Sequence, residues 1–137
     1  MVYVKLLKNL NLKKIDNLIS LAIFGSYGTK YFREGFSDID IFVLIEKRED
    51  IIDEIEMEDN ILHILQEYFN YDNIHLTFLT MRDYDTRLAN QYIDSEDKLI
   101  LDEFKEIDFR LYVNKYLREN EWRIKRAREY NKFLEEN

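Results

Sequence analysis

A chain of 137 residues, 46% of them apolar, has the size and composition of one folded domain with a packed core, which excludes a disordered protein. The sequence contains no cysteine, so disulfide frameworks, thiolate metal sites and cysteine nucleophiles are excluded. The net charge of −8 makes a long nucleic acid an unexpected ligand, because binding to phosphate chains normally requires a basic surface.

Targeting signals are not recognisable in the sequence. No run approaches the roughly 18 apolar residues of a membrane span. The first residues lack the basic and then apolar layout of a signal peptide. We therefore expect a cytoplasmic protein without a membrane partner.

The first part of the chain predicts one short helix and then two strands. Apolar residues within 10–18 suit a helix, and the apolar run 20–24 predicts a buried strand that ends at Gly25. The second strand is expected over residues 38–45. Alternation along this strand places four side chains on one face: Asp38, Asp40, Phe42 and Leu44.

The rest of the chain predicts further helices and two more strands. Helices are expected over 48–69, 81–92 and 103–135, the last with a break near Asn120, and strands over 73–79 and 98–101. The whole chain is expected to form a single α+β domain. A small sheet is packed on one side by helices in a core of residues 1–102, followed by a C-terminal helical segment over 103–135.

Two aspartates open the second strand. Residues two apart on a strand point the same way, so Asp38 and Asp40 place two carboxylates side by side. Adjacent carboxylates repel each other unless a cation lies between them. Mg²⁺ commonly uses one or two carboxylates together with substrate phosphates, so the pair is a candidate metal site. By itself the pair equally suits an exposed strand end with two solvated aspartates.

A Gly-Ser pair follows the first strand. Glycine at position 25 lets the backbone approach a ligand closely. Backbone amides there, together with the Ser26 hydroxyl, can hold a phosphate as a helix begins. An ordinary strand-to-helix turn is the alternative explanation for this pair.

The combination of these motifs resembles the signature of the polymerase-β-like nucleotidyltransferase superfamily. The resemblance covers residues 21–44: an apolar strand, Gly25-Ser26, a short loop, and Ser37-Asp38-Ile39-Asp40 opening a second strand. It implies that Gly25, Ser26 and Ser37 bind the nucleotide and that Asp38 and Asp40 bind Mg²⁺ or Mn²⁺. Lys30 and Arg33 are expected to neutralise the leaving pyrophosphate or to be exposed loop charges.

One part of the family pattern is missing. The superfamily has a third carboxylate on a strand after the long helix, and the matching position here falls on His75. A slip of one residue is excluded by side-chain parity. Imidazole can accept a proton near neutral pH but is a poor ligand for Mg²⁺. We therefore assign His75 as a candidate catalytic base, the alternative being a polar residue of the strand.

In chain length and motif order the sequence is most similar to the MNT type, the small antitoxin partner of HEPN toxins. This resemblance implies transfer of AMP from ATP to a tyrosine hydroxyl of an all-helical HEPN toxin. The alternative is a degenerate antitoxin that neutralises the toxin by binding only. Between Arg110 and Lys132 there are eight basic and three acidic residues, a net charge of +5 that leaves −13 on the rest. This segment is either a solvated helix face or a docking surface for an acidic partner or a phosphate.

Overall fold

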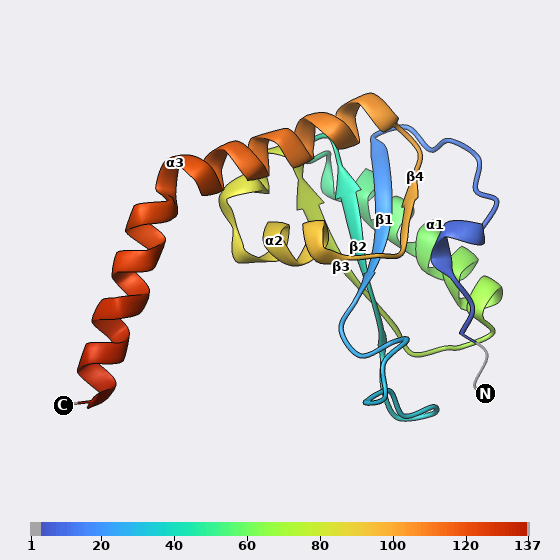
Figure 1. Ribbon diagram of the computed structural model, residues 1–137. Helices are drawn as coiled ribbons and strands as arrows, with labels where there is room; N and C mark the ends of the chain where they lie inside the picture. The colour runs from blue at the N-terminus through green and yellow to red at the C-terminus, as the bar shows by residue number, and fades with distance from the viewer. Residues whose placement is uncertain (1–3, 137) are drawn as a thin grey trace.

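The two apolar segments 18–24 and 39–45 form the centre of a four-stranded sheet in the computed structural model, which describes residues 4–136 (Figure 1). They are strands β1 (Leu18–Phe24) and β2 (Ile39–Ile45), and the outer strands are β3 (Ile74–Thr80) and β4 (Lys98–Ile100). The order is β3-β2-β1-β4. β1 runs antiparallel to β2 and β4, and β2 runs parallel to β3, so the sheet is mixed.

Helices cover both faces of this sheet, and the prediction of helices on one side is wrong. Helix α1 (Ile51–Phe69) packs on one face, whereas α2 (Arg87–Asp94) and the first half of α3 (Glu103–Glu136) pack on the other. Two short 3-10 helices, η1 (Leu7–Asn9) and η2 (Met81–Asp85), connect the elements. Helices cover both faces of the sheet because β1 and β2 carry buried side chains at nearly every position, so that neither face can be left exposed to water.

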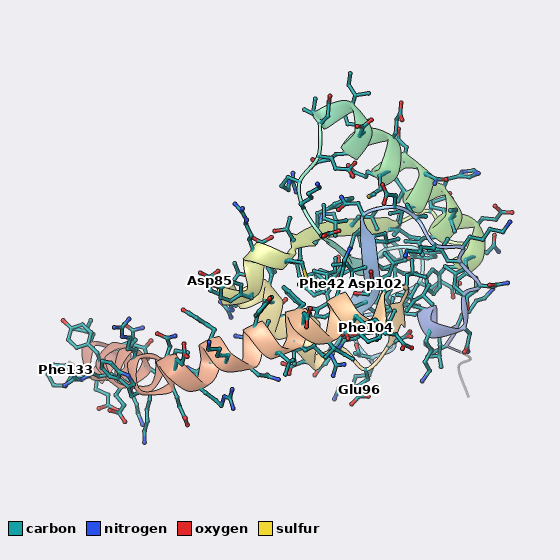
Figure 2. The ribbon with its side chains drawn as sticks, turned by 90° about the horizontal axis from the view of Figure 1, so that it is seen from above. Phe42, Asp85, Glu96, Asp102, Phe104 and Phe133 are labelled. Carbon is teal, nitrogen blue, oxygen red and sulfur yellow. The ribbon has the colours of Figure 1, made fainter. Side chains whose placement is uncertain are left out.

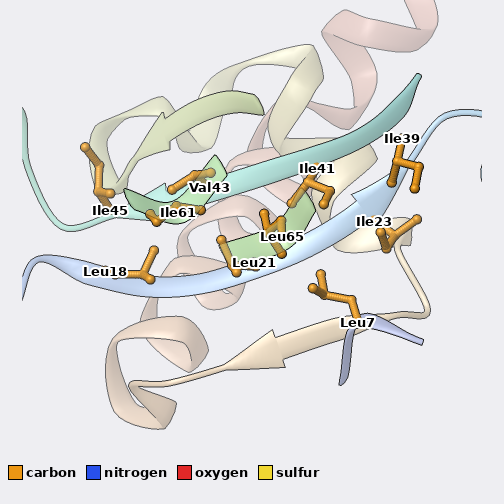
Figure 3. Packing of buried hydrophobic residues seen from close by; sticks show 10 residues of the cluster. All are labelled: Leu7, Leu18, Leu21, Ile23, Ile39, Ile41, Val43, Ile45, Ile61 and Leu65. Carbon is orange, nitrogen blue, oxygen red and sulfur yellow. The ribbon is translucent and has the colours of Figure 1, made fainter. Parts of the chain in front are cut away.

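Two separate hydrophobic cores result. Figure 3 shows the core on the α1 side, where side chains from β1 and β2 meet α1 and η1. Its buried members are Leu7, Leu18, Leu21, Ile23, Ile39, Ile41, Val43, Ile45, Ile61 and Leu65. The core on the other face consists of Ile19, Ala22, Phe42, Leu44, Leu79, Ala89, Tyr92, Phe109 and Val113. Because the second core includes residues of α3, the packed core extends beyond the expected boundary at residue 102.

The helix predicted over residues 10–18 does not form. Residues 10–17 form no regular element apart from a turn, and Leu18 already belongs to β1. Leu10, Leu12 and Ile15 instead lie as an irregular segment against the α1-side core. Asn17 has a positive φ of 73°, which is incompatible with continuing a right-handed helix into Leu18. Packing of the apolar side chains therefore outweighed the local helical spacing.

The remaining helices follow the predictions with three differences. The helix expected over 81–92 is divided into η2 and α2 by Thr86, which is extended with φ −95° and ψ 160°. α1 begins at Ile51 rather than residue 48, because the Asp50 carboxylate caps it by accepting the Ile52 amide at 2.9 Å. The predicted break near Asn120 is wrong, since α3 is continuous and changes direction without an interruption (Figure 1). The Asn120 side chain donates to the carbonyl of Tyr116 at 2.9 Å, one turn back in the same helix.

The second half of α3 leaves the body of the protein. From residue 118 onward no described residue is buried, and Figure 2 shows this part, with Phe133, extending away from the sheet. We call residues 118–136 the α3 arm. None of the helices formed by residues 4–136 is both long enough and apolar enough to cross a membrane.

Candidate active site

The sheet brings the predicted site residues together at one of its ends. Because β1 is antiparallel to β2 and β2 is parallel to β3, the end of β1 meets the starts of β2 and β3 (Figure 1). In the register of the sheet, Phe24 pairs with Asp40, and Asp40 pairs with His75. The Gly25 turn that follows β1, Asp40 of β2 and His75 of β3 therefore lie next to one another at this end of the sheet.

Gly25 and Asp40 fit against each other in a way that requires glycine. Gly25 has a φ of 73°, a conformation that side chains strongly disfavour. A Cβ atom at this position would also collide with Oδ2 of Asp40. The turn after β1 thus lies directly against the carboxylate that opens β2.

The charge of Asp40 is incompletely compensated. Burial raises the pKa of the Asp40 carboxyl above its ordinary value, and the nearby Asp38 carboxylate raises it further. Electrostatic attraction to His75 and a hydrogen bond from it oppose this rise without cancelling it. A half-buried carboxylate beside a second, exposed one is an environment that a cation would relieve.

The Gly-Ser segment forms a turn, and the helix expected to begin there is absent. Ser26 accepts two hydrogen bonds at its carbonyl, from the amide of Thr29 at 2.9 Å and from the Thr29 hydroxyl at 2.6 Å. Gly28 has a second positive φ, of 83°, which ends any helical continuation. A phosphate at this position would therefore meet a turn rather than the end of a helix.

Comparison with known protein families agrees with this arrangement. The profile of the family described as "Polymerase beta, Nucleotidyltransferase" matches residues 7–106, well over half of the chain. The chain belongs to this nucleotidyltransferase family.

Other likenesses are more distant. This chain is similar to a chain in a solved structure of a toxin–antitoxin pair, a mutant form of MntA-HpeT, with 21% sequence identity and a TM-score of 0.46. The similarity covers 85% of this chain and 87% of the other. No curated protein matches the sequence. At this distance the assembly of that pair says nothing about the partner of this nucleotidyltransferase.

The loop between the two motifs of the nucleotidyltransferase is closed by Ser37. The Ser37 hydroxyl accepts the Arg33 amide at 2.9 Å, and the Ser37 amide donates to the Arg33 carbonyl at 2.8 Å. Tyr71 adds an anchor that sequence reasoning missed. Its hydroxyl donates to the Ser37 carbonyl at 2.6 Å and accepts the Gly35 amide at 2.9 Å. Tyr71 therefore fixes the loop that leads into Asp38, and no sequence motif marks it.

Lys30 and Arg33 lie exposed on the same loop. The Lys30 ammonium is 5.2 Å from the centre of the Tyr31 ring, and Tyr31 is itself exposed. Within residues 4–136 neither cation forms an ion pair with a carboxylate, so both are available to an anionic ligand. The structure does not bring either side chain into contact with Asp38 or Asp40.

His75, the residue expected at the position of the family's third carboxylate, lies on β3 next to Asp40. It pairs with Asp40 across the parallel strands, and its Nδ1 is 3.5 Å from Oδ1 of Asp40. The imidazole is 63% exposed, so its Nε2 can reach a bound substrate. A histidine whose Nδ1 faces a carboxylate keeps the other nitrogen free to accept a proton.

The residues at this site fit a divalent cation only in part. Within residues 4–136, no group of three His, Asp or Glu side chains is arranged to hold a metal ion. Asp38 and Asp40 supply two carboxylates, and their mutual repulsion favours a cation between them. Mg²⁺ accepts such a pair when substrate phosphates complete its oxygen shell. The site therefore fits a metal that binds together with a nucleotide.

A cavity of about 900 Å³ opens beside Gly25. The N-terminal segment, the turn after β1 and the loop between α2 and β4 form its walls, which include Lys8, Tyr27 and Asp97. Asp38, Asp40 and His75 are not among the lining residues. Asp97 is already engaged, since its carboxylate accepts the amides of Leu7 and Lys8 at 2.7 and 2.8 Å. The cavity thus lies on the β4 side of the turn, away from the two candidate metal ligands.

Proposed function

We propose that this protein transfers AMP from ATP to a tyrosine hydroxyl of a partner protein in a Mg²⁺-dependent reaction. The observation that carries the proposal is that the Gly25 turn after β1, Asp40 of β2 and His75 of β3 lie next to one another, with Asp38 just before β2. We further propose that the partner is an all-helical HEPN toxin and that the modification makes this protein its antitoxin. The similarity to the MNT type in chain length and motif order supports this second part.

The order of these residues across the sheet suggests how the nucleotide would be oriented, from the β1 side to the β3 side. The Gly25 turn and Ser26 would hold the β- and γ-phosphates, and Asp38 and Asp40, at the start of β2, would then face the α-phosphate. The nucleoside and the acceptor then lie toward His75 on β3. Mg²⁺ held by Asp38 and Asp40 would neutralise phosphate charge during the reaction.

The transfer step is a single displacement at phosphorus. The acceptor oxygen forms a bond to the α-phosphorus while the bond from that phosphorus to the oxygen bridging to the β-phosphate breaks. The hydroxyl proton passes to Nε2 of His75, and pyrophosphate leaves past the loop that carries Lys30 and Arg33. Added AMP gives the toxin bulk and negative charge, which would repel RNA phosphates.

A second candidate function is neutralisation by binding alone. The observation that favours it is that, within residues 4–136, no third carboxylate joins Asp38 and Asp40 in a group that could hold a metal ion, and that an exposed His75 lies beside Asp40. In this case the α3 arm would hold the toxin, and the nucleotide site would be dispensable for protection.

Co-expression with the protein encoded by the neighbouring gene, which we expect to be the toxin, followed by intact mass measurement, distinguishes these functions. We expect a mass gain of one or more AMP units on the toxin, and its loss with Asp40→Asn. Asp59→Asn is the matched control, because Asp59 is an exposed aspartate on α1 away from the site. A stable complex without modification, insensitive to Asp40→Asn, would establish binding alone. If neither a complex nor a modification is found, the antitoxin role is ruled out.

Variants of His75 test its assignment separately. If His75 takes the proton, His75→Ala should lower the rate of transfer without weakening Mg·ATP binding. His75→Asp would restore the family's carboxylate and should regain transfer relative to His75→Ala. Equal rates for wild type and His75→Ala would exclude His75 as the base.

A further inference from the structure

Strand β3 forms an outer edge of the sheet that is unusually open. Its seven residues, Ile74–Thr80, contain no lysine, arginine, aspartate, glutamate or proline. Its register with β2 is continuous from end to end, without a bulge. Natural proteins usually protect such edges with lysine, proline, bulges or very short strands, and the opposite edge strand β4 has only three residues. β3 therefore has the features of a strand that accepts another strand.

The backbone of β3 has groups directed away from the sheet. The amide of Ile39 donates to the carbonyl of Asn73 at 2.8 Å, and this hydrogen bond determines which backbone groups of β3 point toward β2. Residues 73, 75, 77 and 79 consequently bond to β2, and residues 74, 76, 78 and 80 face outward.

The outward-facing backbone groups of β3 form hydrogen bonds at the two ends of the strand and lack such partners in its middle. The Ile74 amide donates to the carbonyl of Asp72 at 3.0 Å, and the Thr80 amide donates to Oδ2 of Asp83 at 2.8 Å. Between them, no residue within 4–136 forms a hydrogen bond with the outer backbone of Leu76 or Phe78. Two amides and two carbonyls thus remain unpaired, spaced as in a β-ladder.

The side chains of β3 connect this edge to the candidate active site. Ile74, Leu76 and Phe78 pack on the α1-side core. By strand alternation, His75 and Thr77 lie on the opposite face, the face on which His75 contacts Asp40. A strand added beside β3 would therefore present alternate side chains on the same face as His75 and Asp40.

We propose that a non-helical segment of the otherwise helical acceptor protein binds in extended form as an added strand beside β3, with the acceptor hydroxyl on a side chain next to His75. This inference rests on the proposed transfer of AMP and specifies how the acceptor is held. The occupant is a polypeptide backbone because the unpaired groups are those of a ladder. Neighbouring strands are about 4.8 Å apart, so the added strand lies roughly 10 Å from Asp40. A long side chain such as tyrosine suits that distance better than serine or threonine.

A matched pair of variants tests the backbone pairing. Leu76→Ala and Leu76→Pro both remove the leucine side chain, but only proline removes the outward amide. Proline is tolerated on an edge strand where its amide faces solvent. The probe is a blocked seven-residue peptide of alternating threonine and valine with one central tyrosine, incubated with Mg·ATP and followed by mass spectrometry.

We expect Leu76→Ala to modify the peptide nearly as well as wild type and Leu76→Pro to lose about tenfold or more. Both variants should bind Mg·ATP as wild type does, which shows that they are folded. Equal modification by the two variants would overturn the edge pairing while leaving the transfer activity standing. If wild type modifies neither the peptide nor the co-expressed toxin, the proposed function is overturned instead.

Amide hydrogen exchange measured by NMR gives an independent reading. In the free protein the amides of Leu76 and Phe78 should exchange quickly, whereas those of His75 and Thr77 should be protected by β2. Saturating peptide should protect Leu76 and Phe78 selectively. Peptide modification without this protection would place the acceptor elsewhere. Protection that grows with protein concentration in the absence of peptide would show that a second copy of the chain occupies the edge.

Discussion

The Cα atom of Gly25 lies against the carboxylate of Asp40, so that no side chain fits between the turn after β1 and the start of β2. This contact joins the two motifs of the sequence, Gly-Ser and Asp-x-Asp, into one site. It also makes the conformation of the turn depend on where the carboxylate points.

Gly25→Ala should therefore damage both stability and nucleotide binding. A left-handed conformation costs alanine about 1–2 kcal/mol, and the collision with Asp40 adds to this. Gly35→Ala is the matched control, because Gly35 also has a positive φ of 85° but has no atom within 4 Å of the added Cβ. Urea denaturation should show a larger loss for Gly25→Ala, and calorimetry should show weaker Mg·ATP binding only for that variant. Equal effects of the two substitutions would contradict the importance of the contact.

Asp40→Asn should stabilise the protein at neutral pH while abolishing Mg·ATP binding. The pKa of Asp40 is raised in the folded state, chiefly by burial, so ionisation of this carboxyl opposes folding. The favourable contribution of the protonated form is present below the ordinary pKa of aspartate and is lost as the pH rises through the raised pKa. The melting temperature of the variant should exceed that of wild type at pH 7, by roughly 1–4 °C. The difference should shrink as the pH falls toward about 4.

The controls for this prediction separate charge from general effects. Asp59→Asn removes an exposed carboxylate from α1 and should change neither stability nor binding measurably. A variant carrying both Asp38→Asn and Asp40→Asn should show no Mg²⁺-dependent ATP binding by calorimetry. Unchanged binding in that variant would show that these carboxylates are not the metal ligands.

Tyr92→Phe should destabilise the fold, because the Tyr92 hydroxyl connects two buried polar groups. It lies 2.6 Å from the Ser20 hydroxyl and donates to Oε1 of Glu106 at 3.1 Å. Arg110 donates to the other Glu106 oxygen at 2.8 Å. Removing the hydroxyl leaves Ser20 and Glu106 short of a partner, at a cost of about 1–3 kcal/mol. Chemical denaturation checks this, with the half-exposed Tyr112→Phe as a control that should cost much less. A similar loss in both would contradict it.

Ending the chain after Asn120 should leave the body of the protein folded. No described residue of the removed part is buried, so we expect the melting temperature to stay within about 2 °C of wild type. Ending the chain after Asp108 removes the buried Phe109 and Val113 and should prevent folding. The first truncation should retain Mg·ATP binding and lose affinity for the toxin in a pull-down. Full toxin affinity after that truncation would exclude the α3 arm as a docking surface.

Several features of this protein followed from the sequence by itself. The positions of β1 and β2, the placement of Asp40 near the start of β2 and the position of His75 on β3 agree with the predictions, whereas Asp38 lies just before β2 and not on it as predicted. These features depend on local geometry: apolar runs end at glycine or aspartate, and side chains alternate along a strand. The family signature extends over residues 21–44, and the family match confirms the family, whereas the roles of the site residues within the signature stay predictions.

Tertiary structure alone decided the rest. Contacts between residues far apart in the chain determine the features that were not predicted. These features are the helices on both faces of the sheet, the irregular segment 10–17, the open edge of β3, the anchoring of the loop by Tyr71, and the buried hydrogen bonds from Ser20 through Tyr92 to Glu106. Local propensity contributes only tenths of a kilocalorie per residue, whereas burying one large apolar side chain contributes about 1.5–3 kcal/mol. Where the two disagreed, as at Leu10, Leu12 and Ile15, burial determined the structure.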